Sequence, residues 1–298
     1  MSKQATAAAA ITVVLWASSF VAIRHVGTEF SAGALSLARL GLGSILLGAL
    51  LFVRPRQEHP VRRWPAKGDW PQLLACGLLW FGVYNVALNE AERRLDAGTA
   101  AMLVHIAPLL IAVLAGLTLG EGFPRRLVGG GLVAFAGIVV IGTSASTGHA
   151  EIWGVVLCLV AAIAYAVGVV TQKPLLSRLP AAEVTWLACT VGAVSCLPYA
   201  RTLIDELRTA SSGGIWWVVY LAVFPTALGF TTWAFALRRT TAGAMGVTVY
   251  AVPVVAIVLG WIFLGETPTL LALAGGALCL AGVAISRRTQ RVAATSRN

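Results

Sequence analysis

The sequence is poor in charged side chains. Asp, Glu, Lys and Arg make up 11% of its 298 residues, whereas a soluble domain typically carries about 25%. So few charges cannot cover the surface of a water-soluble protein of this size. Hydrophobic residues make up 58% of the chain and the mean hydropathy is +0.83, so we expect a lipid bilayer to surround most of it.

Acidic residues are scarcer than basic ones, 12 against 22, which gives a formal net charge of +10. A basic chain can indicate nucleic-acid binding when its charges gather on one soluble face. Here the Lys and Arg residues lie in short breaks between apolar runs. This distribution argues against a nucleic-acid partner and is typical of the loops of a membrane protein.

The sequence also lacks the motifs of common enzyme and metal sites. It has no HExxH pair, no GxxxxGK[ST] nucleotide-binding loop and no paired Asp motif within an apolar run. The cysteines form no CxxC pair, and we expect them to be small buried residues within apolar runs. They are Cys76, Cys158, Cys189, Cys196 and Cys279. The sequence therefore predicts no catalytic residue, no metal and no cofactor.

Long apolar runs are what the chain has instead. A membrane-spanning helix needs about 20 mainly apolar residues, whereas barrel strands are about ten residues long and alternate in polarity. We therefore expect helices, and we interpret the first run as an uncleaved span rather than a signal peptide, because nine more follow. The predicted spans are residues 5–23, 32–53, 71–91, 97–119, 126–143, 152–171, 184–200, 215–237, 242–264 and 269–286.

The basic residues predict the orientation of these spans. Lys and Arg accumulate on the cytoplasmic side of membrane proteins. Of the 22 basic residues, 16 fall on the side of the N-terminus, five fall on the opposite side, and Arg39 alone lies within a span. This bias predicts an even number of spans with both termini in the cytoplasm.

The two halves of the chain resemble each other at a constant offset of 145. Residues 97–142 align with residues 242–287 without a gap and share 13 identities in 46 positions, including a proline, a glutamate and several glycines. Five spans per half is an odd number, so the second half must enter the membrane from the opposite side. The sequence therefore predicts an all-α integral membrane protein with ten transmembrane helices, formed by inverted five-helix repeats at residues 1–145 and 146–298.

Two segments carry a resemblance to a known family. AGTAAMLVHIAPLLIAVLAGLTLGEGFPRRLVGGGLVAFAGIVVIG and its repeat, AGAMGVTVYAVPVVAIVLGWIFLGETPTLLALAGGALCLAGVAISR, resemble the hallmark half of EamA-type exporters of the drug/metabolite transporter superfamily. The opening LWASSFVAIR and LSLARLGLGSILL are similar to the first two spans of that family. The resemblance implies ten helices, cytoplasmic termini and export of amino acids or related metabolites. It is nearest to bacterial aromatic and general amino-acid exporters, which implies a bacterial inner membrane.

Three functions are open at this point. The first is export of amino acids, including aromatic and other neutral ones, by alternating access between the two repeats. The second is export of drugs or other metabolites through the same cavity. The third is a membrane scaffold or sensor that transports nothing. In the first reading the partners are a small-molecule substrate and the bilayer, and the protein is a monomer or a homodimer with glycine-rich helix contacts.

Aromatic and small polar residues deep within the spans are candidates for lining a substrate cavity. Aromatic residues often anchor at the lipid interface, but that explanation does not suit residues deep in a span. A cavity of mixed aromatic and polar character suits amphiphilic substrates. His105 is equally consistent with a hydrogen-bonded histidine between helices. The candidates are Trp16, Ser19, Tyr84, Asn85, His105, Tyr165, Trp233, Thr248 and Tyr250.

Five further residues are candidates for gating or structural roles. Pro108 and Pro253 are expected to kink their spans, either to shape a central cavity or serve as a hinge, or only for packing. Arg39 is costly within a span, and a structural or gating role is favoured over substrate selection. Glu121 and Glu266 are expected to be interfacial carboxylates beside the N-terminus of the next helix, with gating as the alternative.

Overall fold

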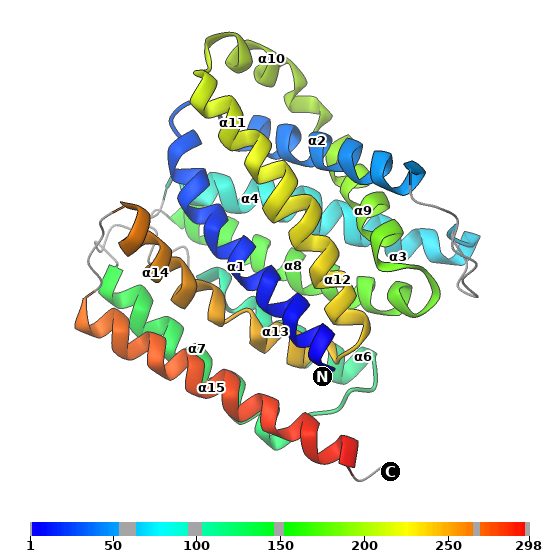
Figure 1. Cartoon of the computed structure of the whole chain (residues 1–298), viewed down its shortest axis with the longest axis vertical. Coiled ribbons are helices and arrows are strands. Elements are labelled where there is room, and N and C mark those ends of the chain that lie inside the picture. The colour runs from blue at the N-terminus through cyan, green and yellow to red at the C-terminus, as the bar shows by residue number, and fades with distance from the viewer. Residues whose placement is uncertain (1, 54–63, 95–102, 146–151, 265–268, 296–298) are drawn as a thin grey trace.

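The computed structural model describes residues 2–53, 64–94, 103–145, 152–264 and 269–295, and this part of the chain is helical without a strand (Figure 1). Helices occupy every one of the predicted apolar runs within the described residues. In the first half they are α1 (Lys3–Val26), α2 (Ala32–Val53), η1 (Lys67–Asp69), α3 (Trp70–Ala75), η2 (Cys76–Val83), α4 (Tyr84–Ala91), α6 (Ala107–Thr118) and α7 (Arg125–Ala145).

The described residues from 152 onward are helical as well. Its elements are α8 (Ile152–Arg178), α9 (Ala181–Ser195), η3 (Leu197–Tyr199), α10 (Ala200–Thr209), α11 (Ser212–Leu221), η4 (Ala222–Leu228), α12 (Gly229–Arg238), α13 (Ala242–Thr248), α14 (Ala251–Leu264) and α15 (Leu270–Thr295). By length and composition, five helical stretches of the described residues could cross a membrane, or six if the bent pair around Cys196 is one span.

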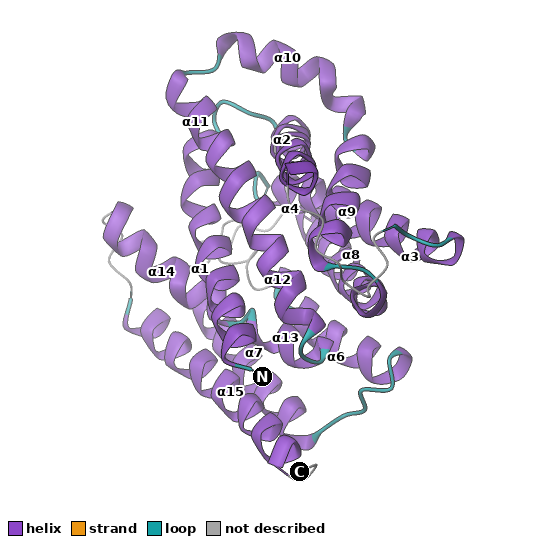
Figure 2. Ribbon diagram, turned by 45° about the vertical axis from the view of Figure 1, so that its right-hand side comes forward, coloured by secondary structure: helices purple, strands orange, loops and turns teal. Residues whose placement is uncertain are grey.

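Three predicted helix ends were wrong, and the last of them is that of the run predicted at 269–286, which continues as helix α15 to Thr295. The run predicted at 152–171 continues as helix to Arg178, through Pro174. The run predicted at 184–200 ends at Ser195, and the chain bends by 51° into α10. α10 lies at the end of the bundle remote from both termini (Figures 1 and 2). Its Ile204 and Leu207 are exposed, as in a helix that lies along a membrane surface.

Helices from the two halves pack in pairs. α7 lies along α15, α6 packs on α13, α2 on α9, and α1 on α12; the α7–α15 pair forms one edge of the bundle in both views (Figures 1 and 2). Glycines allow the close approach of α7 and α15, because a Cβ on Gly137 would lie 2.6 Å from the carbonyl oxygen of Gly275. Gly130 meets Gly282 and Gly137 meets Gly275, so these two helices run antiparallel.

The main core runs through the bundle, from the first turns of α1 to the end of α9 at Cys196. Leu175, Leu176, Leu237 and Met245 are buried in it with the alanines of the first turns of α1. The same cluster continues into a layer of aromatic rings at mid-bundle. Three aromatic residues of this core, Trp80, Tyr165 and Phe230, also line a cavity.

Candidate functional site: a central cavity

A cavity lies against the aromatic layer. Residues from the first and second halves of the chain contribute to its walls, and most come from mid-helix positions. The structure brings together six of the nine predicted cavity residues, which are Trp16, Ser19, Tyr84, Asn85, His105 and Tyr165. Arg39 and Pro108, predicted in gating or structural roles, also line it.

Four aromatic residues, Trp16, Trp80, Tyr165 and Phe230, form what we call the aromatic floor of the cavity. Trp80 stacks on Tyr165 with ring centroids 5.2 Å apart, and Trp16 meets Trp80 edge to face at 6.2 Å. Phe230 lies 5.1 Å from Trp80 and 5.3 Å from Trp16. Such interlocked rings contribute beyond their buried area. The floor therefore presents a rigid apolar surface to the cavity.

Two π-helical segments hold this floor. η2 contains Trp80, and η4 ends directly before the helix of Phe230. π-helical turns are rare and frequent at functional sites, and their wider backbone leaves carbonyl groups to be satisfied. Asn85 donates its side-chain amide to the carbonyl oxygens of Phe81 at 2.8 Å and Trp80 at 3.4 Å, and Trp16 Nε1 donates to the carbonyl oxygen of Pro225 at 3.3 Å. Side chains of the cavity thus stabilise the irregular backbone that shapes it.

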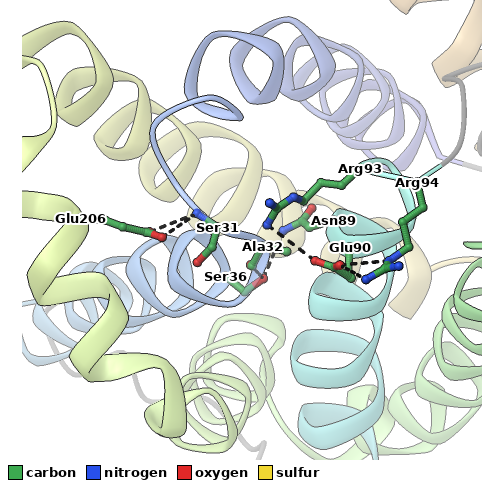
Figure 3. Close-up of polar contacts among 8 residues, drawn as sticks. All are labelled: Ser31, Ala32, Ser36, Asn89, Glu90, Arg93, Arg94 and Glu206. Carbon is green, nitrogen blue, oxygen red and sulfur yellow. Dashed lines mark hydrogen bonds and ion pairs between the residues drawn. The ribbon is translucent and has the colours of Figure 1, made fainter.

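The wall above the floor is polar. Arg39 is only 6% exposed, and its Nε donates a hydrogen bond of 3.1 Å to Thr226 Oγ1 in η4. Asn89 donates its side-chain amide to Ser36 Oγ at 3.1 Å, and the Ser36 hydroxyl donates in turn to the carbonyl oxygen of Ala32 at 2.8 Å. Figure 3 shows this chain of contacts between α4 and α2. These bonds fix the polar wall against the first turns of α2.

Carboxylates order the rim at the end of α4 and the start of α2 (Figure 3). Glu206 of α10 accepts the backbone N–H of Ser31 with both oxygens, at 3.0 and 3.1 Å. Glu90 pairs with Arg94 at 2.9 Å and with Arg93 at 3.7 Å. Exposed ion pairs of this kind contribute little stability.

The helices that carry Pro108 and Pro253 are broken rather than continuous. Turns separate the helical residue Val104 from α6, and α13 from α14, so each proline lies in the first turn of a new helix. The expected clash with a carbonyl four residues earlier is therefore avoided, because the first turn of a helix tolerates the missing N–H. The two breaks lie close together, since the rings of His105 and Tyr250 are 6.3 Å apart.

Glu121 acts across the two halves of the chain. Its carboxylate accepts the backbone N–H groups of Ala242 at 2.7 Å and Gly243 at 3.1 Å. It thus caps α13 rather than the next helix, α7, which corrects the sequence-based expectation. Gly120 and Gly122 have φ of 67° and 65°, a left-handed conformation that glycine adopts without strain. This turn aims the carboxylate at the other half.

Lys173 reinforces the same corner from α8. Its ammonium group donates to the carbonyl oxygens of Leu237 and Thr240 at the end of α12. Glu121 therefore holds the N–H groups at the start of α13, and Lys173 holds the carbonyl groups just before it. We call this pair the α12–α13 clamp; it closes the bundle beneath the aromatic floor.

Three predicted cavity residues lie outside the cavity wall. Trp233 is fully buried and stacks on Trp16 at 5.1 Å, behind the floor. Thr248 donates its hydroxyl to the carbonyl oxygen of Ala244 in its own helix. Tyr250 is fully buried, and its hydroxyl has no hydrogen-bond partner among the described residues. Pro253 is buried outside the wall, whereas Glu266 falls outside the described residues.

Part of the cavity lining was not predicted from the sequence. Trp80 and Phe230 form half of the floor, and Glu92 lies in the wall. Both aromatic residues occupy mid-span positions, the same signal that singled out Trp16 and Tyr84. Glu92 lies at the end of its apolar run. A carboxylate at such a position ordinarily lies at the membrane interface, so the sequence did not indicate that Glu92 is part of the cavity wall.

A family comparison covers nearly the whole chain. The model of the EamA-like transporter family matches residues 4–143 and residues 152–288. The two matched stretches leave out only the ends and the short segment between them.

Relatives with similar sequences span the same length. The chain is 38% identical to the "Probable terminal-alkyne amino-acid exporter" of Streptantibioticus cattleyicolor, over 96% of this chain and 95% of that protein. It is 26% identical to the "Probable amino-acid metabolite efflux pump" of Escherichia coli, with the same coverage of 96% and 95%. A solved crystal structure of another protein shares the fold with a TM-score of 0.78, at 22% identity, over 96% of this chain and 97% of that one.

Proposed function

The chain belongs to the EamA-like transporter family, and from this premise we propose that it exports amino acids with apolar side chains through the central cavity by alternating access. The observation that carries the proposal is the cavity itself, which has an aromatic floor and a polar wall. A pocket with these features suits a small amphiphile.

The alternating-access part of the proposal rests on two inverted repeats, residues 1–145 and 146–298. The contacts between α7 and α15 support it, because they are reciprocal. A Cβ on Gly130 would meet Gly282, and a Cβ on Gly282 would meet Gly130. Gly137 and Gly275 meet in the same way, and each set of contacts maps onto the other when 145 is added or subtracted. Reciprocal contacts of this kind arise around a two-fold axis.

The membrane topology in this proposal has ten crossings with both termini in the cytoplasm of a bacterial cell. Support comes from the helices found at all ten apolar runs, and from both termini lying at one end of the bundle (Figures 1 and 2). The excess of Lys and Arg on that side supports a cytoplasmic location. In this orientation the cavity faces outward and the α12–α13 clamp closes the cytoplasmic side.

The residues that we propose to contact the substrate are those of the floor and the polar wall, above all Trp16, Trp80, Tyr165 and Arg39. The names of the relatives support an amino-acid substrate. A second candidate class is amino-acid metabolites that keep the head group, which the name of the Escherichia coli relative favours.

The test is a flux panel in proteoliposomes that contain the purified full-length chain. Radiolabelled leucine, phenylalanine, lysine and glutamate would be loaded, and their release measured with and without a proton gradient. We expect release of leucine and phenylalanine above that of empty liposomes, and little release of lysine or glutamate. Release of none of the four would refute the proposal, and a dependence on the gradient would identify proton coupling.

A further inference from the structure

Arg39 is a buried cation that lines the cavity and forms no ion pair with a carboxylate in the described part of the chain, although the charge of Glu92, which lines the same cavity, acts on it. Its only hydrogen bond there joins Nε to the neutral hydroxyl of Thr226, and the ion pairs of that part use other arginines. A charge in a membrane interior is costly unless it is paired. The bond to Thr226 occupies Nε and orients the guanidinium plane, while the two Nη groups are the donors that bind a carboxylate in a bidentate fashion.

Two asparagines of the same cavity, Asn85 and Asn89, offer hydrogen-bond acceptors, whereas Arg39 offers only donors. Asn85 donates its amide NH₂ to backbone carbonyl oxygens, which only accept, so its Oδ1 is the atom available for a donor. Asn89 donates its NH₂ to Ser36 Oγ, because the Ser36 hydroxyl already donates to Ala32. Both asparagines line the same cavity as Arg39. An ammonium group, which has three donors and no acceptor, suits such oxygen atoms.

We propose that the cavity recognises a zwitterionic head group, with the carboxylate on Arg39 and the ammonium on the oxygens of Asn85 and Asn89, while the apolar side chain of the substrate lies against the aromatic floor. This inference rests on the proposed export function and deepens it, because it names the two charges that a substrate must carry. It assigns Arg39 a direct role in binding, where the sequence favoured a structural or gating role.

The binding experiment uses three compounds that share one carbon skeleton. L-leucine carries both charges, 4-methylpentanoate only the carboxylate, and isopentylamine only the ammonium. Their dissociation constants would be measured by calorimetry on the purified full-length protein in nanodiscs. For the unaltered protein we expect L-leucine to bind about tenfold more tightly than either analogue. Isopentylamine that binds as tightly as L-leucine would overturn the inference without any variant.

Variants of Arg39 then separate binding from folding. In Arg39→Gln we expect the affinity for L-leucine and for 4-methylpentanoate to fall about tenfold or more, with less than a twofold change for isopentylamine. Arg39→Lys should restore part of the loss, because it keeps the charge but not the planar fork. The matched control is Arg208→Gln, which removes an exposed arginine of α10 that pairs with Asp205 and should change none of the three affinities.

The outcomes distinguish this inference from the proposed function. An equal loss for all three compounds in Arg39→Gln, or no loss for L-leucine, would overturn the assignment of the carboxylate. If L-leucine binding depends on Arg39 but no amino acid crosses proteoliposomes, export is refuted and the head-group assignment stands. If leucine flux is robust and insensitive to Arg39→Gln, export stands and the head-group assignment fails.

Discussion

The α7–α15 contact differs from the cavity in how far the two halves of the chain resemble each other. Along α7 and α15, glycines at equivalent positions of the two halves face one another, and each contact has its counterpart. In the cavity the equivalence is lost, since the positions offset by 145 from Trp16 and Trp80 hold Ala161 and Pro225. Shared packing and divergent chemistry indicate that the two halves keep the same helix contacts at α7 and α15, while only some of their helices line the cavity.

The largest effect is expected from a substitution that disrupts the contact between α7 and α15. In Gly137→Ala the new Cβ would lie 2.6 Å from a backbone carbonyl oxygen and a backbone nitrogen of α15, so the helices must separate. Overpacking of this kind costs roughly 1–3 kcal/mol, and the midpoint of thermal unfolding in detergent should fall by several degrees. The matched control is Gly129→Ala in the same helix, where no atom lies within 4 Å and stability should be retained or raised. Equal behaviour of the two variants would show that the contact is not tight.

The next effect alters the divergent region alone. Phe230 is a buried part of the aromatic floor, and Phe230→Ala deepens the cavity. We expect the ratio of phenylalanine to leucine transport to rise roughly tenfold, because one larger group in an apolar pocket changes discrimination by about 1–3 kcal/mol. The measurement is initial flux of both amino acids in proteoliposomes. Phe224→Ala, on an exposed position of η4, serves as the control, and an unchanged ratio in Phe230→Ala would remove the floor from substrate selection.

A smaller effect is expected at the α12–α13 clamp, where Glu121 of the first half binds the start of α13 in the second half. Glu121→Gln keeps the shape of the side chain but weakens its bonds to the first N–H groups of α13. A charged cap of a helix is worth about 1 kcal/mol, so opening beneath the floor should become roughly fivefold more frequent. The readout is the labelling rate of a cysteine in place of buried Met245, in a protein without native cysteines. Asp205→Asn, on exposed α10, is the control, and an unchanged rate in Glu121→Gln would exclude a gating role.

The smallest effect is expected at Tyr250. Its hydroxyl is buried and has no partner among the described residues, so removing it relieves a desolvated polar group. Tyr250→Phe should keep leucine flux within about twofold and stability within about 0.5 kcal/mol. A strong loss of flux with intact stability would instead assign Tyr250 to the substrate path. It would then contradict the distinction between residues that pack the helices and residues that line the cavity.

Hydropathy was enough to predict where helices lie, because a bilayer demands long apolar segments whatever their contacts. It could not predict α10, whose polar residues lower its mean hydropathy although Leu203, Ile204 and Leu207 follow a helical period. It could not predict the breaks before Pro108 and Pro253 either. A proline is compatible with a kink or with a new helix start, and the neighbouring helices decide between them.

The site was predictable only in part for the same reason. Deep aromatic positions led to Trp16 and Tyr165, but which of two faces of a helix looks into a cavity depends on packing with other helices. Trp233 shows this, since it lies one layer behind the floor. The partner of Glu121 is 121 residues away along the chain, and no local pattern indicates such a contact.

The most direct test of alternating access through this cavity is the accessibility of Ser19. Ser19→Cys in a protein without native cysteines would be labelled from each side of oriented membrane vesicles with a membrane-impermeant thiol reagent, with and without leucine. We predict labelling from the outer side without substrate, and labelling from the cytoplasmic side that appears or increases with leucine. A residue that is never labelled from the cytoplasmic side, while leucine flux continues, would contradict the account.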